Sequence, residues 1–443
     1  MDIPTTPAAP SAVTSATPSA RSRIFPWIVF GLTFGLMLSD YMSRQVLAAV
    51  FPLLKSDWGL SDSQLGSLTS VVALMVGVLA FPLSLAADRW GRVRSLLVMA
   101  TVWSVATLLC ALATGYGQML GARFLVGVGE AAYGSVGVAV MLSVFAPRLR
   151  ASLSGAFLAG GSFGSVLGVA LGGIVAAHIG WRWTFVVMAV VGLLLVAAFR
   201  MLITESALSR HQVAETPAPD SPPAPHNTSR APLSSLFSSV SLWCAYLGGG
   251  LQLFVGGVLL AWLPSFFNRS YSMPPGRAGL VAAAYVLLGG IGMIVCGIIT
   301  DRIGRTDPVR QWSSALVYCT ISLILLTIAF GLGTGPAQLI VLALGTLTAS
   351  GSTGATTSMV ASLTHHSLRA TAFATVALAN NVFGLALGPL VVGFLADRYG
   401  LANALRLVPL VYLGAIIALA LGRRAYPAGL RRLAALDTRP TAA

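Results

Sequence analysis

Two pairs of charged residues stand inside segments that are otherwise apolar. Asp40 and Arg44 lie four positions apart in the stretch LMLSDYMSRQ, so that in a helix they share one face. Arg123 and Glu130 occupy the stretch GARFLVGVGEAAYG. A charge at the depth of a lipid bilayer is costly and usually marks a path for a proton, an ion or a substrate. We therefore predict that these four side chains form one site that binds a proton and an anion.

A buried network of ion pairs that only fixes helix packing is the alternative for these charges. Counting about 1.5 Å of rise per residue from the ends of the two segments places Asp40 and Glu130 near the middle of the membrane. Arg44 and Arg123 then lie nearer the outer surface. This order of charges favours the binding site, in which one pair gates while the other binds.

Uncharged polar residues complete the candidate site. Tyr41 and Tyr133 follow the charged residues closely in the sequence. The second half of the chain has no charge at a comparable depth, so its candidates are neutral: Gln252, Tyr285, Asn380, Asn381 and the SGSTGATTS run at 350–358. Serine and threonine in membrane helices often bond only to local carbonyls. The asymmetry assigns proton coupling to the first half.

Histidine and cysteine show no catalytic or metal-binding pattern. The five histidines have no metal-ligand spacing, and no HExxH, GxSxG or phosphate-loop motif occurs. The cysteines lie in apolar runs without a CxxC pair: Cys110, Cys244, Cys296 and Cys319. We therefore expect no enzymatic activity, no metal and no cofactor, with a proton gradient as the driving force.

The composition indicates an integral membrane protein built of helices. Hydrophobic residues make up 56% of the chain and charged residues 9%, against about 25% charged residues in soluble domains. The net charge of +14 comes from arginines in short segments between apolar runs. Such charges set membrane orientation, so we expect the bilayer and a small molecule as partners, and no nucleic acid.

The apolar runs divide the chain into two sets of six spans, each long enough to cross a membrane. We predict spans near 25–51, 65–87, 95–115, 119–145, 152–177, 183–203, 240–267, 278–300, 312–333, 337–363, 370–396 and 404–422. The predicted organisation is a disordered cytoplasmic tail 1–23, a bundle 24–203, a cytoplasmic linker 204–236, a second bundle 237–423 and a cytoplasmic tail 424–443. Basic residues gather on the side that holds both termini, which places that side in the cytoplasm of a cell with an inner membrane.

The two sets of spans repeat each other. The loop motif SLAADRWGRVR between spans two and three recurs 213 positions later in GIITDRIGR. Glycines of span five recur 220 positions later in span eleven, as Gly164 and Gly384 show. An aspartate at a helix end can accept from backbone N–H groups at a neighbouring helix start. We assign the motifs to a cytoplasmic gate: Asp88, Arg89, Gly91, Arg92, Asp301, Arg302, Gly304 and Arg305.

The loop motif resembles the signature of the major facilitator superfamily, whose fold is two pseudo-symmetric six-helix bundles. The stretches at 40–68 and 129–168 resemble its spinster-like branch, although Ser43 stands where that branch has an acid and Asp40 lies three positions earlier. The resemblance implies that Arg44 and Glu130 pair and line the cavity. It also implies that the loop motifs stabilise the outward-open state and that the protein works as a monomer.

Three transport functions fit these features. We expect a secondary active transporter that works by alternating access, coupled to protons, for a small organic anion or metabolite. Export of a lysolipid-like amphiphile is the alternative that the spinster resemblance suggests. A multidrug/proton antiporter is disfavoured because Val169 stands where the glycine-rich motif of those proteins has proline. A channel and a membrane enzyme are disfavoured further.

Overall fold

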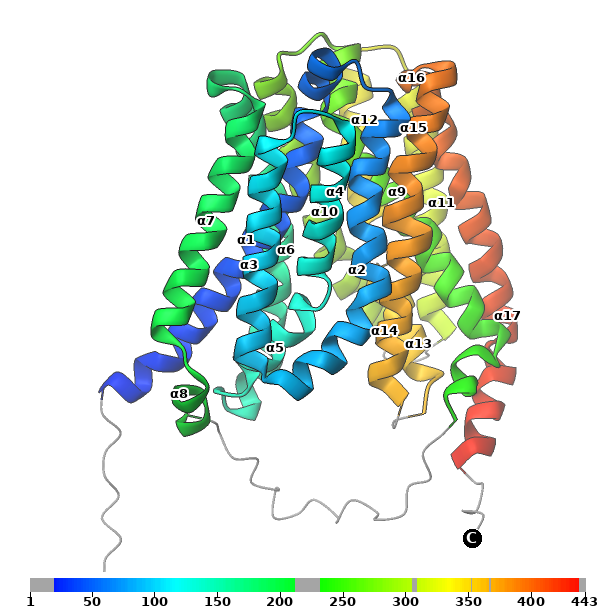
Figure 1. Cartoon of the computed structure of the whole chain (residues 1–443). Helices are drawn as coiled ribbons and strands as arrows, with labels where there is room; N and C mark the ends of the chain where they lie inside the picture. Colours follow the sequence, from blue (N-terminus) through cyan, green and yellow to red (C-terminus); the bar gives the residue numbers. More distant parts are fainter. Residues whose placement is uncertain (1–19, 212–231, 305–308, 352, 366–367, 438–443) are drawn as a thin grey trace, which may run out of the picture.

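The computed structural model describes residues 20–211, 232–304, 309–351, 353–365 and 368–437, which form a single helical bundle (Figure 1). Within these residues there is no strand, and twelve helical segments are long and apolar enough to cross a membrane. The predicted all-helical membrane protein with twelve spans is confirmed.

Six spans come from the first half of the chain. They are α1 (Ala20–Trp58), α2 (Asp62–Trp90), α3 (Arg92–Leu112), α4 (Tyr116–Glu130) continued by α5 (Tyr133–Leu142), α6 (Pro147–Ile179) and α7 (Trp181–Leu202). Long apolar runs adopt helices in lipid because a helix satisfies its own backbone hydrogen bonds.

Six more spans come from the second half. They are α9 (Val240–Ser270), α10 (Pro275–Gly304), α11 (Val309–Gly331), α12 (Pro336–Ala349) with α13 (Thr353–Ser362), α14 (Arg369–Ala379) with a π-helical segment η3 (Asn380–Ala386) and α15 (Leu387–Tyr399), and α17 (Val411–Asp437). The short helix α16 (Leu401–Leu407) and the 3-10 turn η4 (Val408–Leu410) precede α17.

Helical structure extends beyond the predicted bundle limits. α1 begins inside the predicted tail 1–23, and α17 continues well past residue 423. The predicted linker 204–236 contains the short helices α8 (Glu205–Arg210) and η1 (Leu233–Phe237). A polar composition did not prevent α8, because Thr204 caps it and Leu208 is buried. Residues 1–19, 212–231 and 438–443 of the predicted tails and linker lie outside the described residues.

The bundle has two ends, which we name by the chain termini. At the terminal face α1 begins and α17 ends, and at the distal face α1 turns into α2 and α15 turns into α16 (Figure 1). Gly91 and Gly400 make tight turns at opposite faces with φ of 95° and 80°. Other residues rarely adopt this backbone region.

The two halves pack against each other through small residues toward the distal face. Gly66 of α2 leaves no room for a side chain against the Pro389 carbonyl of α15, and the Cα of Gly279 in α10 would lie 3.1 Å from a Cβ on Gly173 of α6. Phe51 packs against Trp262 with ring centroids 5.3 Å apart and the two rings tilted by 57°. Toward the terminal face the helices of the two halves diverge (Figure 1).

Corresponding spans of the two halves break at the same repeat position. α4 ends at Glu130, and 220 positions later α12 is capped by Ser350. The eleventh span contains the π-helical segment that begins at Asn380. Interrupted helices leave backbone polar groups without partners inside the helix, and in membrane proteins they are tolerated beside cavities. The breaks therefore point to the centre of the bundle.

Candidate functional site

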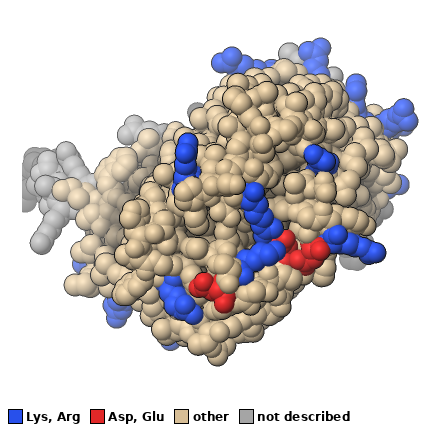
Figure 2. All heavy atoms as spheres, turned by 90° about the horizontal axis from the view of Figure 1, so that it is seen from above, with Lys and Arg blue, Asp and Glu red and all other residues tan. Residues whose placement is uncertain are grey.

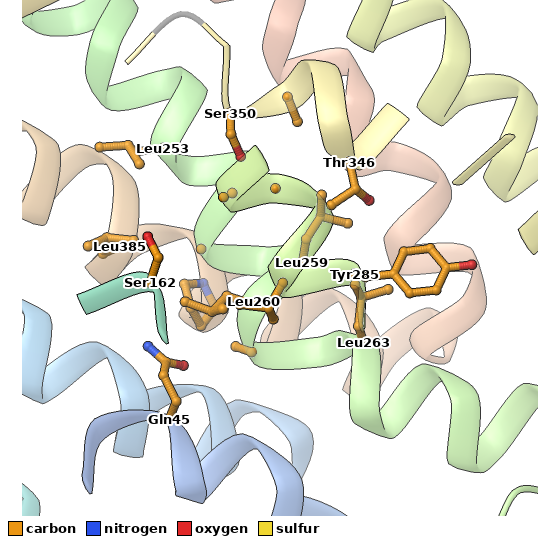
Figure 3. Close-up of a pocket in the computed structure, with 18 of the residues that line it drawn as sticks. Gln45, Ser162, Leu253, Leu259, Leu260, Leu263, Tyr285, Thr346, Ser350 and Leu385 are labelled. Carbon is orange, nitrogen blue, oxygen red and sulfur yellow. The ribbon is translucent and has the colours of Figure 1, made fainter. Parts of the chain in front are cut away.

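A cavity of about 360 Å³ lies between the two halves (Figure 3). Its polar lining residues come from both halves: Tyr41, Arg44, Gln45, Thr69, Ser162, Gln252, Tyr285, Thr346 and Ser350. In the close-up, Gln45 of α1 and Ser350 at the end of α12 approach from opposite sides. The volume falls within the range of about 300–1,000 Å³ that is usual for small-molecule sites.

The wall of the cavity is chemically uneven. Arg44 is the single charged residue among the described residues that line it. The second half contributes a cluster of leucines: Leu253, Leu259, Leu260, Leu263 and Leu385 (Figure 3). A ligand that fills this space meets one guanidinium, a few neutral donors and a broad apolar surface.

Arg44 is held from behind by Glu130. Its Nη2 and Nε lie 2.8 Å and 3.0 Å from Oε2 of Glu130. The Glu130 side chain is fully buried, whereas that of Arg44 is 12% exposed. The guanidinium also lies 5.1 Å from the ring centroid of Tyr41, within the range of a cation–π interaction. The predicted pair is therefore formed, but Glu130 lies behind the cavity wall and only Arg44 lines it.

Asp40 is the second acid of this cluster. It is buried and lies close enough to Arg44 and Glu130 to interact electrostatically with both. Among the described residues, none donates a hydrogen bond to Oδ1 of Asp40 or to Oε1 of Glu130. Two carboxyl groups thus lie near one guanidinium, which bonds to Glu130, and each keeps one oxygen without a donor among the described residues.

Arg123 has a different position from the one predicted. Its side chain is entirely buried, and it does not line the cavity. It donates to the carbonyls of Ser43 at 3.1 Å, Arg44 at 3.3 Å and Leu68 at 3.3 Å. Arg123 and Glu130 do not bond to each other, because Glu130 bonds to Arg44 and the fork of the Arg123 guanidinium matches three carbonyls. Arg123 joins α4 to α1 and α2.

Other predicted residues also lie outside the cavity lining. The Tyr133 hydroxyl donates to the Thr33 carbonyl at 2.6 Å. Asn381 donates to the Ala377 carbonyl at 2.9 Å, and its Cβ lies against Gly77 of α2. Asn380 lies against Gly249, and in the described part of the bundle its Oδ1 accepts no hydrogen bond.

Gln252 and Tyr285 do line the cavity as candidates of the second half. Gln252 donates from Nε2 to the Cys319 sulfur at 3.0 Å, and the Tyr285 hydroxyl donates to the Leu339 carbonyl at 2.8 Å. Both side chains are therefore fixed from behind, which suits residues that present a rigid wall to a ligand.

Four polar lining residues had no signal in the sequence strong enough to select them. They are Gln45, Thr69, Ser162 and Thr346, uncharged polar residues in otherwise apolar segments. The position of Gln45 next to Arg44 is a feature that would have found it, and for the other three that feature is the helix face on which each lies.

The predicted gate motif lies at the terminal face without the expected cap. The Asp88 and Arg92 side chains are 64% and 50% exposed and pair with each other at 3.5 Å. Arg89, Asp301 and Arg302 are exposed, Gly304 packs against Gln311, and Arg305 lies outside the described residues.

A residue that sequence reasoning missed caps the helix after this motif. Glu205 of α8 accepts from the Val93 N–H at 3.0 Å, at the start of α3. This contact satisfies one of the four N–H groups that a helix start leaves free. The prediction that Asp88 caps a neighbouring helix is thus not met in this conformation.

Comparisons with known proteins point to one family. The model of the Major Facilitator Superfamily matches residues 33–389. The chain is 27% identical to the probable L-galactonate transporter of Escherichia coli over 63% of each chain. It is 26% identical to the protein spinster of Drosophila melanogaster, over 67% of this chain and 47% of that protein. The alignments thus span less than two thirds of these two relatives.

A solved structure has the same fold. A crystal structure of a bacterial homolog of the human lysosomal transporter spinster, inward-facing and unoccupied, matches with a TM-score of 0.74 and 18% identity. The match covers 94% of this chain and 99% of that structure. At this identity the likeness concerns the arrangement of the helices.

Proposed function

This chain belongs to the Major Facilitator Superfamily, a family of transporters and not of enzymes, and from this premise we propose that it moves a small organic anion by alternating access, coupled to protons. The chain is a multi-pass membrane protein with small-molecule substrates. The observation that carries the proposal is Arg44, the single charge that the described residues contribute to the lining of the cavity.

The guanidinium of Arg44 suits a carboxylate. Its bond to Glu130 uses Nε and Nη2, and the other edge of the guanidinium bonds to none of the described residues, so it can reach a ligand. Arginine binds carboxylates through parallel N–H groups, and such charge-assisted bonds are about twice as strong as neutral ones. The similarity to an L-galactonate transporter supports an organic acid as the substrate.

The leucines opposite Arg44 favour a substrate with an apolar body. Burial of apolar surface contributes about 25 cal/mol per Å², so an acid with a hydrocarbon or aromatic part gains more from this wall than a fully hydroxylated one. An amphiphile of the lysolipid type is the alternative, supported by the similarity to spinster.

The two acids provide the coupling. Asp40 and Glu130 lie beside each other, and each keeps one oxygen without a donor among the described residues, so a proton on this pair relieves the repulsion between two buried carboxylates. A substrate anion on the other edge of Arg44 shares the positive charge that neutralises Glu130, which favours a proton on the pair of acids. Substrate and proton then shift the same equilibrium between conformations.

The basic residues orient the protein. We propose that the terminal face, which carries the arginines of both loop motifs, is cytoplasmic and that the protein resides in the inner membrane as a monomer. The closed distal face then makes this an inward-open conformation. We propose no cofactor, with the proton gradient as the driving force.

The experiment is a thermal-shift measurement on the purified protein with benzoate, L-galactonate, galactose and lysophosphatidylcholine. An acid that binds the folded state raises the melting temperature, by the equivalent of about 2.7 kcal/mol at one hundred times its dissociation constant. We expect a shift with benzoate that disappears in Arg44→Ala.

The matched control is Arg94→Ala, which removes an exposed arginine outside the cavity. It keeps the shift if the effect depends on Arg44 itself. Stabilisation by the lysolipid alone contradicts the anion proposal and selects the amphiphile exporter.

A further inference from the structure

A third copy of the loop-motif spacing lies at the opposite face from the first two. The segment from Gly393 to Gly400 reads GFLADRYG and has the same Gly-x-x-x-Asp-Arg-x-Gly spacing as the segment from Gly297 to Gly304. It ends α15 at the distal face. The equivalent position in the first half, 220 residues before Asp397, is occupied by Ala177.

The aspartate of this copy caps a helix of the other half. Oδ1 of Asp397 accepts from the Asp62 N–H at 2.6 Å, and Oδ2 accepts from the Ser63 N–H at 2.9 Å. These are the first two residues of α2. The positive end of the helix dipole makes a carboxylate the preferred cap there.

Every one of the four free N–H groups at the start of α2 has a partner. A capping box satisfies two of them: the Ser61 hydroxyl accepts from the Gln64 N–H at 3.1 Å, and Oε1 of Gln64 accepts from the Ser61 N–H at 3.0 Å. The two that remain bond to Asp397. If the two halves separate at the distal face, only those two N–H groups lose their partner.

The close approach of α15 to α2 depends on a glycine. A Cβ on Gly393 would lie 2.5 Å from the Asp62 carbonyl oxygen and 2.9 Å from the Ser63 Cα. Real Cβ atoms do not approach backbone this closely. Gly393 therefore allows Asp397 to reach the helix start.

A second contact between the halves converges on the same residue. The buried Asp62 side chain accepts two hydrogen bonds from Arg269 of α9, at 2.6 Å and 2.8 Å, and one from Lys55 at 2.7 Å. Figure 2 shows acidic and basic side chains gathered together on this face. Asp62 is thus bound to the second half through both its backbone and its side chain.

We propose that Asp397 is a positioning residue of the transport cycle, which holds the distal face closed by capping α2 and releases it when the cavity opens to that side. The inference rests on the proposed function in one respect, which is that the protein works by alternating access. It does not depend on the identity of the substrate or on coupling to protons. The aspartates of the other two motif copies, Asp88 and Asp301, are exposed at the terminal face in this conformation. Of the three, the aspartate that caps a helix of the other half is therefore the one at the closed face.

The test measures distances between nitroxide spin labels on Ser56 and Ala402, both exposed at the distal face and in different halves. The labels are placed in a variant without the four native cysteines, in nanodiscs and without substrate. In Asp397→Asn we expect the population with long label–label distances to rise about tenfold relative to the population with short ones. The reason is that two charge-assisted hydrogen bonds become weaker.

Asp57→Asn is the matched control. Asp57 is also an acid of the distal face, but it accepts from the Trp181 indole at 2.7 Å, within the first half. Its substitution is expected to leave the distances unchanged. An unchanged distribution in Asp397→Asn, or an equal change in both variants, overturns the proposal.

Gly393→Ala tests the same contact without altering a charge. Its added methyl group meets the backbone of Asp62, so the long distances are expected to increase here too, while Gly121→Ala, which meets no atom within 4 Å, leaves them unchanged. If Asp397→Asn does not fold, this pair decides: no increase in Gly393→Ala overturns the proposal. Because no substrate is present, a failure of this test is distinct from a failure of the anion proposal.

Discussion

Replacement of Glu130 by glutamine is expected to abolish proton-driven accumulation of substrate while substrate exchange continues. Glutamine keeps the shape of the side chain but neither carries the negative charge that holds Arg44 nor takes up the proton. With one proton per substrate, a difference of one pH unit supports an accumulation of about tenfold, since each unit is worth 1.36 kcal/mol. In Glu130→Gln we expect the ratio to fall to one.

Two assays on proteoliposomes check this result. Uptake of labelled substrate under a pH gradient measures coupling, and counterflow without a gradient measures movement through the cavity. Glu205→Gln is the control, since Glu205 caps α3 far from the cavity lining and its amide oxygen still accepts the Val93 N–H. Equal loss of accumulation and counterflow in Glu130→Gln would favour a purely structural role of the pair.

Replacement of Arg123 by alanine is expected to lower the free energy of unfolding by about 3–5 kcal/mol, the range for breaking a buried charged network. The guanidinium donates to carbonyls of α1 and α2 from α4, and its loss removes three charge-assisted bonds and leaves a cavity. Lysine has a single ammonium and reaches fewer of these carbonyls, so Arg123→Lys recovers only part of the loss.

The measurement is unfolding of the detergent-purified variants, with Arg94→Ala as the exposed control that stays within about 0.5 kcal/mol of the parent. A folded Arg123→Ala variant of unchanged stability that fails to transport would contradict the role of Arg123 in joining α4 to α1 and α2, and would favour a direct role with substrate.

Much of the fold could be predicted because lipid imposes simple rules. Long apolar runs gave the twelve spans, and spacing repeated 213 and 220 positions apart indicated two related halves. The same rules revealed Asp40, Arg44 and Glu130, since a charge in an apolar run is conspicuous. Hydropathy reports the depth of a residue, however, and not the direction in which its side chain points.

That difference explains the errors at the site. Arg123 lies in the predicted segment but turns toward backbone carbonyls, and the break after Glu130 alters the rotation of the residues that follow. Asn380 and Asn381 lie in a π-helical segment, where side chains no longer follow the 3.6-residue period.

Asp62 and Asp397 were missed for another reason. Charged residues are ordinary at the ends of membrane helices, so neither is conspicuous in a hydropathy pattern. Their contact joins residues 335 positions apart, and no local pattern predicts it. It becomes visible only when the two halves are placed side by side.

The central claim is tested most directly by proton movement in proteoliposomes that contain a pH-sensitive dye. On addition of benzoate or L-galactonate, we expect a change of internal pH with the parent protein and none with Arg44→Ala, and its direction distinguishes symport from antiport. A proton signal that appears only with lysophosphatidylcholine, or transport of the acid with no proton signal, would contradict a proton-coupled carrier of organic anions.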